Sequence, residues 1–568
     1  MEAEKPGRAQ LRSPFSVPCS LGIIRYFPTL NQPILSMQKL LLALATASAL
    51  ATPALAQQKD GASQTAEKLD AAALAKIKDE GMNRSKVMET AFYLTDVCGP
   101  RLAGSEGLGR ANAWTKKRLT EYGLTNANVE PWGDFGRGWD IDKSYVAMTA
   151  PYYHAMIGVP KAWTPSTPGS LRKQVVVVKA TTEADLDKYK GQLRDKIVLL
   201  PVAAPLQPNF EPDAKRLSAE DLQKMADAPA STPTTAANRP PADAAMTERM
   251  ATMRAQRELR TKVSAMLMSE GAAAVLSAGR GTDGTVFTTN GAPYAADAKP
   301  VLPELEMSSE DQLRLIRLAE AGIPVEIEME TKTHFQTQDL KGYNVVAEIP
   351  GTDKKLKSEV VMLGGHLDSW HSATGATDNA AGCAVMMEAV RILKASGLKP
   401  RRTIRIALWG EEEEGLHGSR NYVKNHFADP ATMQLKPDHE KLAAYFNLDN
   451  GAGKIRGIYA QGNEAVKPIF TAWLQPFADL GATTVTSRNT GSTDHVAFDA
   501  VGLPGFQFIQ DGLDYFARTH HSNQDTYDRL VADDLKQASV VVASFVYNAA
   551  MRDQKLPRKP LPTVAKPQ

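Results

Sequence analysis

The sequence has few cysteines, no excess of either charge and no internal repeat, and each of these shortages excludes a class of protein. Three cysteines among 568 residues cannot build a disulfide scaffold or a cysteine-rich zinc module. The 66 basic and 64 acidic side chains leave a formal charge of +2, so composition favours neither nucleic acid nor anionic lipid as a partner. No repeat with a period of roughly 20–50 residues is visible, which excludes solenoids and propellers.

The remaining composition is that of an ordinary globular protein. Apolar residues make up 43% of the chain and charged residues 23%, which is too hydrophobic for a disordered chain. Because cysteine is scarce, a metal site in this protein must use histidine and carboxylate ligands. A soluble enzyme is therefore the leading class.

Residues 37–56 have the pattern of a secretory signal peptide. One lysine precedes a short apolar run, and Ala54-Leu55-Ala56 forms a cleavage site before Gln57. The run is shorter than the ~20 residues needed to span a bilayer core, so no stable membrane insertion is expected. We interpret residues 1–36 as a non-native upstream extension. We expect a periplasmic or secreted protein cleaved after Ala56.

Residues 68–335 predict helices first and short strands later. A helical stretch over about 70–123 is interrupted by the turn-rich segment 96–105. Runs of β-branched and apolar residues then predict strands in a β-rich insertion spanning 155–335. These runs lie at 174–178, 196–200, 272–278 and 325–329. The Ala-, Pro-, Ser- and Thr-rich segment 226–245 predicts a flexible loop.

After residue 340, apolar strands alternate with helical segments as far as 555. This alternation predicts an α/β sheet with helices on both faces, whose chemistry lies in the loops after the strands' carboxyl ends. The last residues, 556–568, are rich in lysine and proline and predict a disordered tail.

Acidic and imidazole side chains follow these strands one after another. They are His366, Asp378, the Glu411–Glu414 run, Asp449 and the His520-His521 pair. Singly, each has a structural explanation, such as a helix cap or a solvated face. Together they supply the imidazoles, carboxylates and free base of a two-metal hydrolytic site. Asp368 could accept the other ring N–H of His366. Of the adjacent Glu412 and Glu413, one can bind metal while the other accepts a proton.

The order and spacing of six motifs resemble peptidase family M28, the di-zinc exopeptidases. The motifs are GGHLDS (364–369), TDNAAG (377–382), GEEEEGLHGS (410–419), NLDNG (447–451), GSTDH (491–495) and HHSNQDT (520–526). GGHLDSW together with HHS-x-x-DT is most similar to the plasma glutamate carboxypeptidase (carboxypeptidase Q) branch. The resemblance implies a zinc-exopeptidase (phosphorylase/hydrolase-like) mixed sheet flanked by helices. It would be built from 68–150 and 340–555, with a protease-associated domain inserted at 155–335.

The resemblance also implies two Zn²⁺ per chain and a role for each motif residue. The implied zinc ligands are His366, Asp378, Glu413, Asp449 and His521. Asp378 would bridge the ions, with His366 and Asp449 on one ion and Glu413 and His521 on the other. Glu412 would be the general base and Asp368 the partner of His366. Alignment on Asp525-Thr526 selects His521 over its neighbour, and His520 would then donate to the tetrahedral intermediate.

The implied activity is hydrolysis of terminal residues of short peptides or dipeptides by metal-activated water. The sequence does not decide which terminus is read, and it leaves open a homo-oligomer. His and carboxylate ligands also accept Mn²⁺ or Co²⁺. Three rival interpretations remain: a glutaminyl cyclase-like acyltransferase, a non-catalytic binding protein, and an amidohydrolase of small non-peptide amides. A metal count separates the first from a peptidase, because such cyclases bind one zinc ion.

Overall fold

The computed structural model describes residues 67–202, 205–229, 244–288 and 290–562. The predicted upstream extension, the signal peptide and most of the flexible segment 226–245 lie outside the described residues. Among the helices of the described ranges, none has the length and apolarity to cross a membrane.

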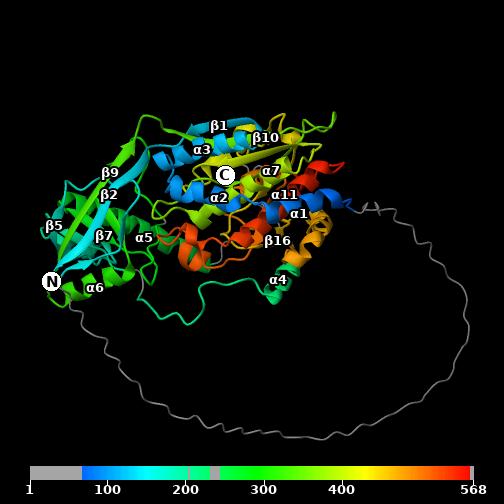
Figure 1. Cartoon of the computed structure of the whole chain (residues 1–568). Helices are drawn as coiled ribbons and strands as arrows, with labels where there is room; N and C mark the ends of the chain where they lie inside the picture. Colours follow the sequence, from blue (N-terminus) through cyan, green and yellow to red (C-terminus); the bar gives the residue numbers. More distant parts are fainter. Residues whose placement is uncertain (1–66, 203–204, 230–243, 289, 563–568) are drawn as a thin grey trace, which may run out of the picture. The chain divides into compact units, whose positions relative to one another are not determined.

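One mixed eight-stranded sheet combines strands from both ends of the chain (Figure 1). Its order is β1-β10-β12-β11-β15-β18-β16-β17, and β12, β11, β15 and β18 are parallel neighbours. The strands are β1 (Thr125–Asp134), β10 (Lys341–Ile349), β12 (Thr403–Trp409), β11 (Val360–His366), β15 (Leu442–Asn447), β18 (Gly505–Gln510), β16 (Ile455–Tyr459) and β17 (Thr484–Thr486).

Helices cover both faces of this sheet, as the alternating pattern predicts. One face packs against α1 (Ala71–Asn83), α2 (Val87–Phe92), α7 (Ala381–Ala395) and α11 (Ala532–Met551). The other face packs against α8 (His417–His426) and α10 (His495–Asp499). Along β11, Val361 and Leu363 join the first core and Met362 joins the second. A strand buried on both faces has apolar side chains at consecutive positions, which is why its sequence is an unbroken apolar run.

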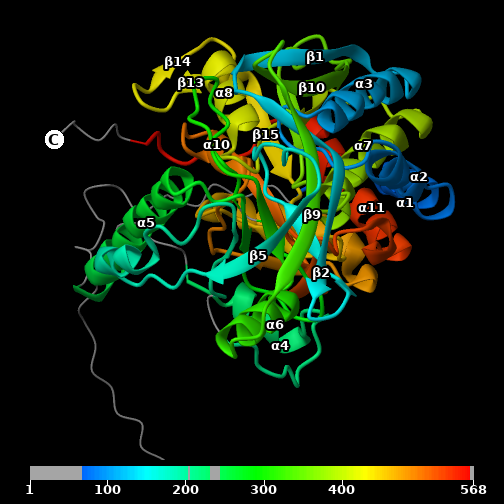
Figure 2. The ribbon, with the colours of Figure 1, turned by 90° about the vertical axis from the view of Figure 1, so that its left-hand side faces the viewer.

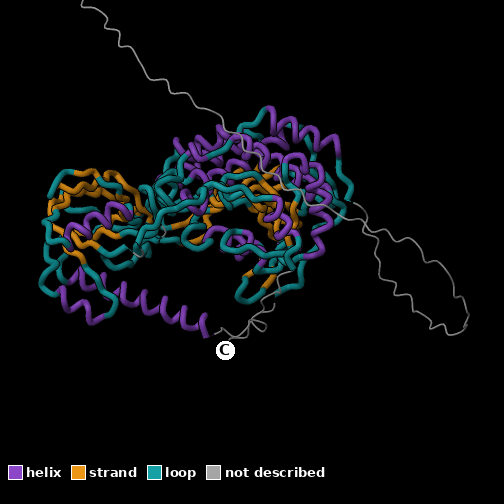
Figure 3. The backbone as a smooth tube through the Cα atoms, turned by 90° about the horizontal axis from the view of Figure 1, so that it is seen from below, coloured by secondary structure: helices purple, strands orange, loops and turns teal. Residues whose placement is uncertain are grey.

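A second eight-stranded sheet has its own apolar core, and Figure 3 shows the strands gathered in two groups. Its order is β3-β2-β9-β5-β6-β7-β8-β4. The strands are β3 (His154–Ala155), β2 (Gly138–Ala150), β9 (Glu326–Gln336), β5 (Leu171–Val177), β6 (Ile197–Leu199), β7 (Ala274–Ser277), β8 (Glu304–Met307) and β4 (Gly158–Pro160). Strands therefore form at all four predicted runs.

The remaining regular elements are short or lie beside the sheets. They are α3 (Glu106–Glu121), α4 (Ala219–Ala226), α5 (Ala244–Ser269), α6 (Ser309–Glu320), α9 (Lys467–Leu474) and the two-stranded β13 (Ala428–Asp429) and β14 (Gln434–Leu435).

The second sheet begins before residue 155, the boundary predicted for the insertion. Strand β2 (Gly138–Ala150) runs antiparallel to β9 (Glu326–Gln336) along its whole length (Figure 2). It therefore belongs to the second sheet and not to the first part of the peptidase sheet. Its pairing partner lies almost 200 residues away in the chain, so local sequence alone could not assign it to a sheet.

The carboxyl-terminal segment is ordered further than its composition predicts. Leu556 is 3% exposed in the main core. Arg558 donates hydrogen bonds to the main-chain oxygens of His439 and Leu442, each at 2.8 Å. Lys559 forms an ion pair with Asp499 at 2.5 Å. The prediction of a disordered tail from 556 is thus wrong for these residues, because their basic side chains bind carbonyls and a carboxylate of the sheet domain; residues 563–568 lie outside the described part.

Candidate functional site

The predicted site residues follow the carboxyl ends of adjacent strands. His366 ends β11, Glu412 and Glu413 follow β12, and Asp449 follows β15. Because β12, β11 and β15 are parallel neighbours, their ends meet at one edge of the sheet. Asp378 lies in the turn η3 (Ala376–Ala380), between β11 and α7. The His520-His521 pair follows β18 after the helical turn η7 (Tyr515–Thr519).

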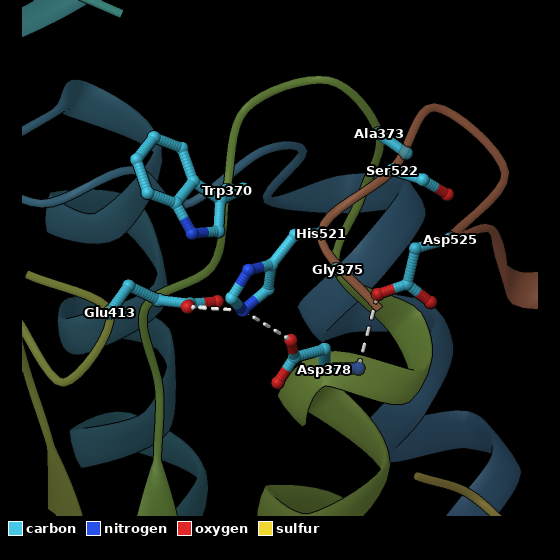
Figure 4. Close-up of a pocket in the computed structure, with 8 residues that line it drawn as sticks. All are labelled: Trp370, Ala373, Gly375, Asp378, Glu413, His521, Ser522 and Asp525. Carbon is cyan, nitrogen blue, oxygen red and sulfur yellow. Dashed lines mark hydrogen bonds and ion pairs between the residues drawn. The ribbon is translucent and has the colours of Figure 1, made fainter. Parts of the chain in front are cut away.

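Two imidazoles approach the same carboxylate in this site, and Figure 4 shows one of them, that of His521, beside Asp378 and Glu413. His366 Nε2 lies 3.2 Å from Asp378 Oδ1 and 3.3 Å from Asp449 Oδ1. His521 Nε2 lies 3.2 Å from Asp378 Oδ2 and 2.8 Å from Glu413 Oε2. Asp378 therefore turns one oxygen toward each imidazole and belongs to both groups of ligand atoms.

These donor atoms fit a pair of metal ions. His366, Asp378 and Asp449 offer ligand atoms within 4.8 Å of one another. Glu413 Oε1 is buried and, among the described residues, has no hydrogen-bond partner. A bridging carboxylate flanked by imidazoles and terminal carboxylates is the donor set of two-metal hydrolytic sites, and its nitrogen and oxygen atoms suit zinc.

Asp368 holds His366 through a different atom from the one the sequence suggested. His366 Nδ1 lies 3.1 Å from the main-chain oxygen of Asp368 but 3.6 Å from its carboxylate. The carboxylate instead accepts the main-chain N–H of Glu413, with Oδ2 at 3.1 Å. Asp368 therefore links the loop after β11 to the loop after β12.

The four glutamates of the Glu411–Glu414 run have separate surroundings. Glu411 accepts the indole N–H of Trp132 at 2.8 Å, and Glu413 contacts His521. Burial raises the pKa of Glu412 well above its ordinary range, and the negative charges of Asp449, Asp494 and Glu413 add to it against the opposing charge of His366. Glu412 is thus a carboxyl with affinity for a proton beside the proposed ligands, which suits a general base.

His520 lies beside the site but makes fewer contacts with its carboxylates. Its ring stacks on that of His521 with centroids 3.7 Å apart, and its Nε2 lies 3.9 Å from Asp378 Oδ2. Burial lowers the pKa of His520 to about 4, so its ring is neutral near pH 7 and keeps one N–H to donate. His520 also belongs to a possible ligand group with Asp378 and His521, but the contact of His521 with Glu413 favours His521 as the ligand.

Asp525 and Arg101 hold the turn that carries Asp378. The sequence did not predict this role for either residue. Asp525 accepts the main-chain N–H groups of Thr377 at 2.6 Å and Asp378 at 3.1 Å. Arg101 is 0% exposed and donates to the main-chain oxygens of Leu94, Leu367, Thr374 and Gly375 at 2.6–2.9 Å. Both residues lie in segments that the sequence singled out, the HHSNQDT motif and the turn-rich 96–105.

Gly375 needs to be glycine in this turn. Its φ is +58°, and an added Cβ would lie 2.3 Å from Ser369 Cβ and 2.9 Å from Arg101 Nη2. A side chain here would therefore displace the guanidinium that binds the turn.

Trp370 lines the pocket beside the proposed ligands (Figure 4). Its ring centroid lies 6.0 Å from that of His521. His371 points away and its ring nitrogen lies 2.7 Å from the main-chain oxygen of Pro160. Tyr515 packs against His520 at 4.8 Å.

The chain is similar to known peptidases. Residues 344–546 match the model of peptidase family M28. Carboxypeptidase Q of Pongo abelii is 26% identical over 84% of this chain and 88% of its own length. Aminopeptidase YwaD of Bacillus subtilis is 26% identical over 46% of this chain and 55% of its own.

A solved structure shows the same fold. A peptidase M28 precursor from Shewanella amazonensis superposes with a TM-score of 0.61 and 26% identity, covering 87% of this chain and 98% of its own. The fold is thus a mixed α/β fold of the M28 type. Residues 344–546 thus match a peptidase family M28 domain, and the protein is a metallo-exopeptidase.

Proposed function

We propose that the protein is an exported di-zinc exopeptidase that removes terminal residues from short peptides or dipeptides. The observation that carries this proposal is the position of Asp378, whose two oxygens contact the imidazoles of His366 and His521. A carboxylate in that position can bridge two ions roughly 3.5–4 Å apart. His366 and Asp449 would complete one site, and His521 and Glu413 the other.

Within this proposal the chain's own residues handle the proton and the substrate oxygen. Two zinc ions, when bound, lower the pKa of a water between them and polarise the scissile carbonyl. Glu412 takes the proton of the attacking water and returns it to the leaving amine. His520 donates its N–H to the substrate oxygen that gains charge.

The second sheet and the amino terminus extend the proposal. The position of the second sheet between β1 and β10 in the chain supports its assignment as a protease-associated insertion. Residues 37–56 support export, with the mature chain beginning at Gln57. A homo-oligomer is compatible with the proposal. The mass of the native protein in solution would give its oligomeric state.

The test combines a zinc count with dipeptide hydrolysis, on protein recovered from the export compartment. We expect a mature chain beginning at Gln57, close to two zinc ions per chain, and turnover of free dipeptides. A chemical cap on the terminus that the enzyme recognises should abolish cleavage, whereas a cap on the other terminus should not. Comparing the two capped dipeptides therefore shows whether the enzyme recognises the amino or the carboxyl terminus.

One zinc ion per chain with no turnover of any peptide would instead favour a glutaminyl cyclase-like acyltransferase. No zinc and no turnover would favour a binding protein. Cleavage of non-peptide amides alone would favour an amidohydrolase.

Zinc loading of the metal-free protein should release protons near pH 7.5. Burial lowers the pKa of His521, but the carboxylates of Glu413 and Asp378 outweigh burial and raise it to about 11. The pKa of His366 is raised in the same way. The charges of Asp449 and Glu412 overcome the effect of burial and raise this pKa well above 6.5. Both rings are therefore protonated without metal, and an imidazole must lose its ring proton to bind zinc. At least two protons per chain should leave, because raised carboxyl pKa values at Glu412 and Glu413 add to the two imidazoles, and zinc affinity should rise with pH.

The measurement is titration calorimetry of zinc binding in two buffers with different ionisation enthalpies. The difference between the two observed enthalpies gives the number of protons released. Identical enthalpies in both buffers would mean that neither imidazole loses a proton, in conflict with the ligand assignment.

A further inference from the structure

A loop of the second sheet pairs with the loop that carries His521. Residues 282–288 lie between β7 and β8, and Phe287 forms an isolated antiparallel bridge with Ser522. The main-chain N–H of Thr288 donates to the main-chain oxygen of His521 at 2.7 Å. The two segments thus form a short piece of β-ladder that includes the His521 peptide itself.

Asn523 extends this ladder on the other side of Ser522. Its main-chain N–H donates to the oxygen of Val286 at 3.1 Å. Its side-chain oxygen accepts the N–H of Val286 at 2.8 Å, and its side-chain amide donates to Gly284 at 3.1 Å. The chain is therefore tied to this loop of the second sheet at His521 and at the two residues that follow it.

Arg518, three residues before His521, joins the same two segments through its side chain. Its guanidinium donates to Asp213 at 2.7 Å and to Asp283 at 2.8 Å. It also donates to the main-chain oxygen of Thr282 and to the hydroxyl of Thr285, each at 3.1 Å. All of these acceptors lie in the part of the chain between β6 and β8, and charge-assisted bonds of this kind are among the stronger ones in proteins.

His521 needs such support because its backbone conformation is unfavourable. Its φ is +58°, in the left-handed region that costs a non-glycine residue free energy and persists only where surrounding structure imposes it. In this conformation its ring reaches both Glu413 and Asp378. The contacts within its own loop are local, such as the N–H of His520 donating to the oxygen of Tyr515.

We propose that Arg518 is a positioning residue for the metal site, and that it acts by fixing the 282–288 loop against the loop of His521. The inference rests on the proposed function, in which His521 is a zinc ligand. Under it, the second sheet is part of the catalytic unit, because one of its loops sets the position of a ligand.

The test compares Arg518→Ala with the matched variant Arg216→Ala in the full-length protein. Arg216 also joins the two parts of the chain, through Asp511 at 2.9 Å and Asp534 at 2.7 Å. Within the described part of the chain, its side chain forms no hydrogen bond or ion pair with the His521 loop or residues 282–288. We expect Arg518→Ala to release one of the two zinc ions about tenfold faster or more, the lower end of the effect of losing residues that orient ligands. Arg216→Ala should release zinc at the wild-type rate.

Two further readouts separate positioning from a general loss of stability. In the metal-free protein, the amides of Thr288 and Asn523 should exchange hydrogen faster in Arg518→Ala, and kcat should fall with KM little changed. Arg518→Lys keeps the charge but not the forked geometry, so its zinc release should fall between wild type and Arg518→Ala. This variant also keeps the proposal testable if Arg518→Ala does not fold.

The outcomes distinguish the inference from the proposed function. A wild-type protein that binds no zinc contradicts the proposed function itself. A wild-type protein with two zinc ions, and an Arg518→Ala or Arg518→Lys variant with unchanged zinc release and hydrogen exchange, overturns only the role of Arg518. If Arg216→Ala released zinc as fast as Arg518→Ala, the role of Arg518 would also be overturned. Any loosening between the two parts of the chain would then be enough to speed zinc release.

Discussion

The substitution Glu412→Gln is expected to abolish peptide hydrolysis while leaving the zinc content at the wild-type level. The amide has nearly the same shape as the carboxylate but cannot accept the proton of the attacking water. Loss of a general base costs about 10²–10⁴-fold in rate. We therefore expect kcat to fall by that factor in the dipeptide assay, with two zinc ions retained by elemental analysis.

Glu414→Gln is the matched control for this variant, because it makes the same chemical change two residues away. Among the described residues, both carboxylate oxygens of Glu414 are buried without a hydrogen-bond partner, so its side chain forms no hydrogen bond with a proposed ligand. Its amide variant should keep activity within about tenfold of wild type.

Zinc content decides how a different result would be interpreted. If Glu412→Gln lost its zinc while Glu413→Gln kept it, the two roles would be exchanged between the neighbouring glutamates. If Glu412→Gln remained active with both ions bound, the base would have to be another carboxyl, and Asp494 is the first to examine. Asp494 is 0% exposed, and burial raises its pKa to about 7.

The edge of the sheet at which the site lies could be predicted from the sequence, because strand ends carry a local signal. An apolar run followed directly by His366, or by Asp449, indicates a buried strand and a polar loop without knowledge of the partner strands. Parallel pairing then brings those loops together. The structure does so for His366, Asp378, Asp449, Glu413 and His521.

The supporting contacts could not be predicted, because they depend on which atom of a residue faces which neighbour. Sequence spacing suggested the carboxylate of Asp368 for His366, whereas the main-chain oxygen is nearer. Arg101 lies more than 260 residues from Leu367, whose oxygen it binds, so no local pattern indicates that contact. The motif HHSNQDT placed Asp525 near the site but gave no reason to expect it on the Asp378 turn.

Long-range pairing limited the fold prediction in the same way. The segment of β2 is not among the predicted strand runs, and only its pairing with β9 assigns it to the second sheet. The tail from Leu556 to Lys559 has a composition typical of disorder. It is held by specific partners, such as the main-chain oxygens of His439 and Leu442, that composition does not report.

Arg101→Met should destabilise the protein and weaken zinc binding together. Methionine keeps much of the apolar stem but removes every donor, which leaves buried main-chain oxygens of Leu94, Leu367, Thr374 and Gly375 without their partner. Unsatisfied buried acceptors and broken buried charge contacts lower the free energy of unfolding by about 3–5 kcal/mol. Leu367 follows His366 directly, and Gly375 precedes Asp378 by three residues, so the loops of two proposed zinc ligands lose their common support.

Arg402→Met separates these two effects. Arg402 is also buried, at 1% exposed, and binds Glu359 and the main-chain oxygens of Arg552 and Asp553. These partners lie at the opposite ends of the strands from the zinc ligands. Urea unfolding should show a large loss of stability in both variants, whereas competition with a chelator should show weaker zinc binding only in Arg101→Met.

Arg101→Lys gives the graded result that this explanation requires. One ammonium group has three donors and a single centre, so it can satisfy some of the four oxygens but cannot span both loops. Stability and zinc affinity should therefore fall between those of wild type and Arg101→Met. If zinc affinity stayed at the wild-type value in Arg101→Met while stability fell, Arg101 would serve the core alone, and the loops of His366 and Asp378 would be held by Asp368 and Asp525 without it.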